Sequence, residues 1–141
     1  MEKVVLLLSG GKDSKKCLEL LLQAGFDVTG LCISGRQKVE EPQARKTAEQ
    51  FGVPIVVVPV FFFDETTWNP VKLIIRDLAM GAVAIAVCWR LKAKRLATGV
   101  KIADIENAQL KWLGPFLRFA TFALKLFGIR LIFPLMDREL R

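Results

Sequence analysis

Residues 4–14 have the sequence VVLLLSGGKDS, which predicts a buried strand, a tight polar turn and the start of a helix. The apolar residues 4–8 suit a strand that is covered on both faces, as in a parallel sheet. Gly10 and Gly11 allow backbone conformations that larger residues forbid, and they leave room for a ligand beside the main chain. The stretch therefore predicts the first strand and helix of an α/β fold, joined by a turn that a ligand can approach.

The predicted helix after this turn ends near residue 24, where Gly25 acts as its C-terminal stop. Asp13 and Ser14 are residue types that favour the N-cap position. A helix start presents free N–H groups and the positive end of the helix dipole, and both favour a phosphate. Lys12 adds a mobile positive charge. The residues thus indicate an anion-binding turn, although a glycine-rich strand-to-helix turn without a ligand would have the same composition.

The six residues from Ser9 to Ser14, SGGKDS, resemble the pyrophosphate loop (PP-loop) of the N-type ATP pyrophosphatases. The pattern of that family is S-G-G-x-D-S, and every fixed position matches. The family is part of the adenine nucleotide alpha-hydrolase (HUP) superfamily. The Walker pattern G-x-x-x-x-G-K-[ST] is absent, which argues against an NTPase that cleaves the γ-phosphate.

The rest of the chain alternates between strand and helix patterns. Residues 26–33 and 53–60 are predicted strands, with a helix over residues 41–51 between them. This repeated βαβ pattern predicts right-handed crossovers and a parallel sheet. A further helix is predicted over residues 71–92, which Met80-Gly81 could divide into two. Two more helices are predicted over residues 107–112 and 116–127, separated by Gly114-Pro115. Further strands are predicted over residues 94–99 and 129–133.

Together with the resemblance, these elements predict one α/β fold class: a Rossmann-like three-layer sandwich with a mostly parallel five-stranded sheet, as in the HUP superfamily. The length of 141 residues suits one domain, so residues 1–141 are expected to form a single PP-loop domain without a separate substrate domain.

A second motif, Leu96-Ala97-Thr98-Gly99, lies at the end of the predicted strand over residues 94–99. Many PP-loop enzymes have A-T-G or a related tripeptide here, followed by an acidic residue five positions after the glycine, where this chain has Asp104. Gly99 would let the main chain approach a ribose or phosphate, and a carboxylate can hold Mg²⁺. Asp104 also suits the N-cap of the following helix. Val100 and Ala103 replace the histidine and first acid that RNA-modifying members often have.

The resemblance implies cleavage of ATP between its α- and β-phosphates and adenylation of an acceptor, with Mg²⁺ as the metal. The implied catalytic residues are Lys12, Asp13 and Asp104, and the implied metal ligands are Asp13 and Asp104. The end of the second strand would lie near the adenine. The implied ATP-binding residues are Leu8, Ser9, Gly10, Gly11, Lys12, Asp13, Ser14, Ile33, Thr98 and Gly99.

The sequence does not identify the acceptor substrate that would be adenylated. The formal net charge of +7 favours polyanions such as RNA, nucleotides or acidic lipids, although a basic surface can also serve solubility alone. By resemblance, tRNA base modification of the thiolation type is the first hypothesis. The alternatives are an amide- or nitrile-forming ligase that acts on a small molecule, and a non-catalytic subunit that binds ATP or AMP.

The chain has no histidine, which excludes histidine-based catalysis and histidine metal ligands. Its three cysteines, Cys17, Cys32 and Cys88, are widely spaced and form no C-x-x-C pair, so no zinc knuckle or paired redox site is predicted. Cys32 and Cys88 are more simply explained as core residues than as a catalytic thiol or a persulfide carrier. No secretion signal is recognised, and a cytoplasmic location is expected.

Residues 116–135 are strongly apolar but contain Arg118, Lys125 and Arg130. Each central charge costs about 2.5–3.5 kcal/mol on membrane-insertion scales, so no membrane span is predicted. A helix that is apolar nearly all round is instead expected to be buried, and in a small domain it favours a homo-oligomer through this segment.

Overall fold

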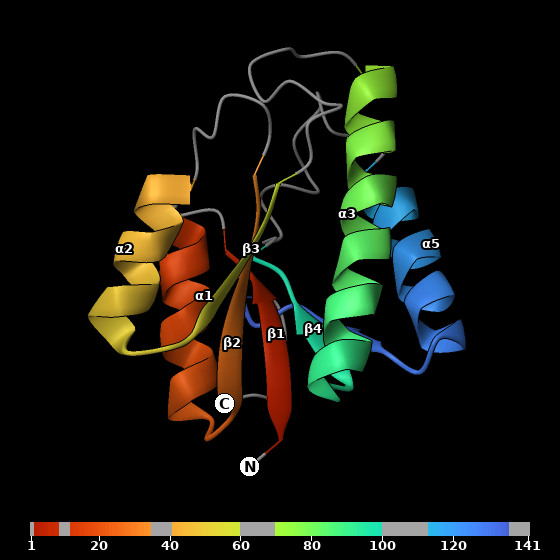
Figure 1. Ribbon diagram of the computed structural model, residues 1–141. Helices are drawn as coiled ribbons and strands as arrows, with labels where there is room; N and C mark the ends of the chain where they lie inside the picture. Colours follow the sequence, from red (N-terminus) through yellow and green to blue (C-terminus); the bar gives the residue numbers. More distant parts are fainter. Residues whose placement is uncertain (1, 9–11, 35–40, 60–69, 100–112, 136–141) are drawn as a thin grey trace.

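The computed structural model describes residues 2–8, 12–34, 41–59, 70–99 and 113–135. These form one sheet between two layers of helices (Figure 1). The helices are α1 (Lys12–Gln23), α2 (Glu41–Phe51), α3 (Pro70–Leu91) and α5 (Leu113–Leu126). The strands are β1 (Lys3–Leu7), β2 (Asp27–Ser34), β3 (Ile55–Pro59), β4 (Arg95–Ala97) and β5 (Arg130–Ile132).

The five strands lie in the order β3-β2-β1-β4-β5, and every neighbouring pair is parallel. In β1, Val4, Val5 and Leu6 are all 0% exposed, as expected for a strand that is covered on both faces. The predicted α/β class with a parallel five-stranded sheet is therefore confirmed.

Each face of the sheet has its own hydrophobic core, and Figure 1 shows the helices that cover it. Helices α1 and α2 cover one face, where Leu18 and Leu21 pack with Val4 and Leu6. Helices α3 and α5 cover the other face, where Cys88 and Leu124 pack with Val5 and Leu96. The alternation of side chains along β1 therefore supplies both cores from one strand.

Local stop signals explain how the first helix ends. Gly25 has a φ of +85°, which a residue with a side chain rarely adopts. Its N–H donates to the Leu22 carbonyl, and the Phe26 N–H donates to the Leu21 carbonyl, so the last turn of α1 is closed before β2 begins. The predicted stop at Gly25 is confirmed.

One predicted helix break is wrong. Helix α3 runs without interruption from Pro70 to Leu91, so Met80-Gly81 does not divide it. One helical glycine costs about 1 kcal/mol, which the packing of a 22-residue helix against the sheet can offset. Helix α5 begins at Leu113, three residues before the predicted start, so Gly114-Pro115 lie inside its first turn, where proline is tolerated because its missing N–H is not needed. The helix predicted over residues 107–112 lies outside the described residues.

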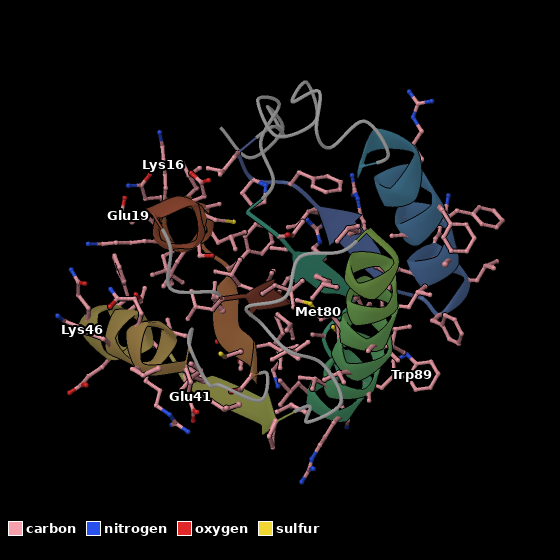
Figure 2. The ribbon with its side chains drawn as sticks, turned by 90° about the horizontal axis from the view of Figure 1, so that it is seen from above. Lys16, Glu19, Glu41, Lys46, Met80 and Trp89 are labelled. Atoms are coloured by element: carbon pink, nitrogen blue, oxygen red, sulfur yellow. The ribbon has the colours of Figure 1, made fainter. Side chains whose placement is uncertain are left out.

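Helix α5 is not buried all round in this chain. Leu124 packs against the sheet, but Phe119 and Phe122 are about 60% exposed and Leu126 is 72% exposed. The exposed Trp89 of α3 lies nearby and donates its indole N–H to the Phe127 carbonyl over 3.1 Å; Figure 2 shows this side chain on the outer side of α3. A homo-oligomer through this surface stays a prediction. Within the described part of the chain, no helix combines the length and the apolar character that crossing a membrane needs.

All three cysteines are buried and form no disulfide. Burial raises the pKa of the Cys17 thiol from its ordinary value of 9.0 to about 12, and that of Cys88 to about 11. Cys32 is 0% exposed within the core between the sheet and helices α1 and α2. The prediction that Cys32 and Cys88 are core residues is confirmed.

Leu21→Ala should lower the free energy of unfolding by roughly 2–5 kcal/mol, because the leucine is 0% exposed and its removal leaves a cavity between α1 and the sheet. Leu126→Ala is the matched control, since that side chain is 72% exposed and should cost no more than about 0.5 kcal/mol. Urea unfolding followed by circular dichroism measures both. Equal losses would contradict the described packing of α1.

The buried thiols predict a loss of stability at alkaline pH. The unfolded thiols ionise near pH 9.0, whereas those of Cys17 and Cys88 in the folded chain ionise only near pH 12 and 11. The stabilisation is thus fully present below pH 9 and is lost as the pH rises above it, by up to about 1.4 kcal/mol per pH unit for each thiol. Urea midpoints should fall less steeply above pH 9 in a Cys17→Ala/Cys88→Ala variant. An unchanged slope would assign the loss to other groups.

Candidate nucleotide-binding site

The strand order creates a switch point between β1 and β4. From β1 the chain moves through β2 to β3 on one side, and then crosses to β4 and β5 on the other side. In open parallel sheets, ligands bind outside the carboxyl ends of the strands at such a point. Leu8 follows β1 and Thr98 follows β4, and the pairing of Leu6 with Ala97 keeps these two strand ends side by side (Figure 1).

Gly99 brings the second sequence motif against the first. A Cβ atom on Gly99 would lie 3.4 Å from the Asp13 carbonyl carbon and 3.4 Å from the Ser14 nitrogen. The main chain after β4 therefore approaches the first turn of α1 so closely that a single Cβ atom at residue 99 would already be in van der Waals contact with it. The two motifs, which are more than 80 residues apart in the sequence, meet at one place.

Helix α1 points its N-terminus at this place. It begins at Lys12, so Asp13 and Ser14 are its second and third residues, and the prediction that they cap the helix is wrong by two to three residues. Ser14 is buried, and Asp13 is half-buried. A carboxylate in a first turn is stabilised by the positive end of the helix dipole, which also attracts a bound anion.

Leu8 and Gly30 fix the direction in which the chain leaves β1. The Leu8 N–H donates to the Leu31 carbonyl over 2.8 Å, and the Leu8 side chain is buried. A Cβ atom on Gly30 would lie only 3.1 Å from the Leu8 side chain, so this leucine occupies the space that the glycine leaves. The sequence reasoning missed Gly30, although a glycine within an apolar strand signals a close approach.

Cys17 connects α1 with the end of β4. Its thiol lies 3.9 Å from the Thr98 carbonyl oxygen, to which it donates a weak hydrogen bond. Because burial raises the pKa of this thiol to about 12, Cys17 stays protonated at neutral pH and is no nucleophile. Its role beside the candidate site, which the sequence patterns did not indicate, is to hold Thr98 against α1.

Ile33 lies at the carboxyl end of β2, the strand next to β1. Ile33 and the following Ser34 are both buried between neighbouring strands. The position is at the same edge of the sheet as Thr98 and Gly99, which is consistent with the implied place of an adenine. A contact of Ile33 with a base stays a prediction.

Several predicted site residues lie outside the described residues: Ser9, Gly10, Gly11, Asp104 and the side chain of Lys12. Within the described ranges, no three histidine, cysteine, aspartate or glutamate side chains gather closely enough to hold a metal ion. The magnesium site at Asp13 and Asp104 is therefore a prediction, as are the contacts of the loop with phosphates.

No protein-family model matches this chain, and no curated protein matches it in sequence. Solved structures do match its fold. The U34-tRNA thiolase NcsA from Methanococcus maripaludis, with its [4Fe-4S] cluster, is 21% identical with a TM-score of 0.68 over 99% of this chain and 53% of that chain. This chain thus spans about half the length of that protein.

Two further structures are similar. A predicted subunit of a tRNA methyltransferase from Methanocaldococcus jannaschii is 22% identical, with a TM-score of 0.62 over 98% of this chain and 70% of that chain. PH1313 from Pyrococcus horikoshii is 13% identical, with a TM-score of 0.58 over 97% of this chain and 38% of that chain. At these identities the likeness shows the fold alone, which is a Rossmann-like α/β sandwich around a parallel sheet.

Proposed function

We propose that this chain binds ATP at the turn between β1 and α1 and cleaves it to AMP and pyrophosphate, in order to adenylate an acceptor in tRNA base modification. One observation carries the proposal: Gly99 lies so close to the start of α1 that a Cβ atom on it would touch the main chain of Asp13 and Ser14. Both motifs of the PP-loop resemblance therefore meet at the switch point of the sheet, where a nucleotide is expected to bind.

The proposed roles follow from the chemistry of a triphosphate. The main-chain N–H groups of residues 9–11, the Lys12 ammonium and the Ser14 hydroxyl would hold the β- and γ-phosphates at the positive end of α1. Gly99 would let the main chain after β4 approach that helix start closely, beside the proposed place of the α-phosphate or ribose. The chain would thus hold ATP in one orientation and neutralise its charge.

Asp13 fits a magnesium ligand, because its carboxylate is half-buried in the first turn of the helix that would hold the phosphates. Carboxylate oxygens are the ligands that Mg²⁺ prefers, and Asp104 is proposed as the second from the sequence motif. When bound, Mg²⁺ would neutralise the charge that develops on the pyrophosphate as it leaves.

In the proposed reaction, an oxygen of the acceptor attacks the α-phosphorus of ATP. The new oxygen–phosphorus bond forms while the bond to the pyrophosphate breaks, and the pyrophosphate leaves with the electron pair. A sulfur or nitrogen nucleophile then displaces AMP from the adenylated acceptor. The first step needs no covalent nucleophile from this chain, which agrees with three cysteines that are all buried.

The proposal of tRNA as acceptor is supported by two similar structures whose names refer to tRNA, the thiolase and the methyltransferase subunit. This chain's own cysteines do not fit an iron–sulfur cluster like that of the thiolase. Cys17 and Cys32 belong to the core on one face of the sheet and Cys88 to the core on the other, and burial raises the pKa of Cys88 to about 11. For thiolation, the sulfur would therefore come from a donor outside this chain.

A second candidate is an adenine-nucleotide-binding subunit without turnover. The observation in its favour is that one similar structure is described as a predicted subunit of a larger enzyme. Binding of ATP without release of pyrophosphate would support this candidate over the enzyme.

Gly99→Val should weaken ATP binding by at least about tenfold, a loss of roughly 1.4 kcal/mol, because its side chain would press on the first turn of α1. Gly81→Val is the matched control: a Cβ atom there meets nothing within 4 Å, and ATP affinity should stay unchanged. Isothermal titration with Mg-ATP measures both, after circular dichroism has shown that both variants fold. Unchanged affinity in Gly99→Val would overturn the site.

Adding unmodified tRNA should release pyrophosphate and AMP from ATP, and Asp13→Asn should slow this release about 10²-fold, the scale for losing one group that stabilises developing charge. Glu19→Gln, which removes an exposed carboxylate on the same helix (Figure 2), should leave the rate unchanged. Chromatography of the nucleotides measures the products. Formation of ADP in place of AMP would contradict cleavage behind the β-phosphate.

A further inference from the structure

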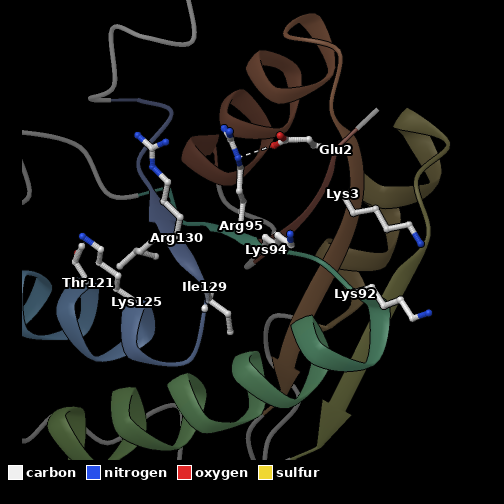
Figure 3. A pocket seen from close by; sticks show the side chains of 11 residues that line it. Glu2, Lys3, Lys92, Lys94, Arg95, Thr121, Lys125, Ile129 and Arg130 are labelled. Atoms are coloured by element: carbon white, nitrogen blue, oxygen red, sulfur yellow. Dashed lines mark ion pairs between the residues drawn. The ribbon is translucent and has the colours of Figure 1, made fainter.

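A hollow of about 1,230 Å³ lies at the amino-terminal edge of the sheet, opposite the candidate nucleotide site (Figure 3). Its lining comes from the starts of β1, β4 and β5 and from the C-terminal ends of α3 and α5. Six of the eleven lining residues are basic: Lys3, Lys92, Lys94, Arg95, Lys125 and Arg130. We call this hollow the basic groove.

The strand order assembles the basic groove. Adjacent strands β1, β4 and β5 begin with Lys3, Arg95 and Arg130, and parallel pairing brings these starts to one edge about 4.8 Å apart from strand to strand. Arg95 and Arg130 are register partners, and Figure 3 shows their side chains extending in the same direction. Three of the six cations, Lys92, Lys94 and Arg95, lie in one short stretch of the sequence, and the other three come from β1, α5 and β5.

The positive charge of the basic groove is larger than the partial negative charge at the helix ends beside it. Six basic side chains against the one carboxylate, Glu2, leave a formal net charge of +5 in the lining, out of +7 for the whole chain. The C-terminal ends of α3 and α5 carry only about −0.5 each. Most of the net positive charge of the chain thus lies at this edge. It is more than the negative ends of the two helix dipoles can neutralise.

One cation is fixed and others extend into solvent. The Arg95 guanidinium lies 2.7 Å from the Glu2 carboxylate and 5.3 Å from the centre of the Phe26 ring, and both contacts orient it. Lys3, Lys92, Lys94 and Lys125 are exposed. Among the residues that the structure describes, none of these four lysines forms an ion pair with a carboxylate.

We propose that the basic groove binds the sugar–phosphate backbone of RNA. Its cations are spread along a concave surface and do not converge on one buried point, which suits a row of phosphates better than a single small anion. A concave surface also fits a strand of nucleic acid better than it fits a flat layer of anionic lipid. The choice of RNA over other polyanions rests on the proposed function.

The position of the basic groove sets its role. The five residues of β1 separate the two edges of the sheet by roughly 17 Å, so the groove does not touch ATP bound at the carboxyl edge. One folded RNA is large enough to contact both edges. The groove therefore positions the RNA through its backbone, without reading its sequence, while the acceptor base lies at the other edge.

The test compares two double variants that lose the same charge. Lys3→Gln/Lys94→Gln removes two exposed cations from the basic groove, and Lys16→Gln/Lys46→Gln removes two exposed cations from α1 and α2, where Figure 2 shows them. Fluorescence anisotropy measures binding to a labelled, unmodified tRNA transcript over a series of salt concentrations. The groove variant should bind at least tenfold more weakly, and its salt slope should be shallower by about 2, one for each lost phosphate contact.

The control variant should stay within about twofold of the unaltered chain, because overall charge alone acts weakly at physiological salt. Equal losses in both variants would overturn the inference in favour of total charge, and no loss in the groove variant would overturn it directly. Loss of binding to phosphatidylserine-containing vesicles, with tRNA binding unchanged, would overturn it in favour of a membrane surface.

Titration with Mg-ATP separates this inference from the proposed function. The groove variant should bind ATP as tightly as the unaltered chain, since its substitutions lie at the opposite edge. A chain that binds tRNA through the groove but binds no ATP would sink the proposed function and leave the groove. A chain that binds ATP but shows no groove-dependent tRNA binding would overturn the inference about the groove and leave the proposed ATP site.

Discussion

The parallel pairing of β1 with both β2 and β4 is the constraint on which the rest of the structure depends. β1 is buried on both faces, and its register with β4 leaves their carboxyl ends side by side. Because β2 and β3 lie on one side of β1 and β4 and β5 on the other, the turns that follow β1 and β4 meet at the same point. The contact of Gly99 with the first turn of α1 is a direct consequence.

The same parallel arrangement gives the two edges of the sheet different electrostatic properties. Helices that connect parallel strands point their N-termini at the carboxyl edge and their C-termini at the amino edge. The start of α1 thus makes the carboxyl edge attractive to anions through main-chain dipoles. The ends of α3 and α5 make the amino edge locally negative, and the basic groove reverses that sign with lysine and arginine side chains.

The cysteines contribute to packing and not to covalent chemistry. Cys17 packs beneath the candidate site and holds the Thr98 carbonyl, while Cys88 lies in the core on the other face of the sheet. Burial raises the pKa of both thiols, so neither is a thiolate at neutral pH. The proposed adenylation does not depend on a thiolate, because it relies on positioning and charge stabilisation.

The sequence by itself determined the order and type of the elements, because apolar periodicity and glycine stops act over a few residues. The predicted helix over residues 41–51 coincides with α2, and Gly25 ends α1 as its conformational freedom predicts. Lys12, Asp13 and Ser14 of the SGGKDS motif begin the first helix, which follows the first strand as the strand and helix patterns on either side predict.

Other features depend on contacts between distant residues, and only the tertiary structure decided them. Packing against the sheet keeps α3 continuous through Met80-Gly81, and the outer face of α5 is exposed because no other element of the described chain covers it. The meeting of Gly99 with Asp13 and the gathering of Lys3, Arg95 and Arg130 both follow from the strand order. Strand order is a matter of pairing across the whole chain, and local periodicity contains no information about it.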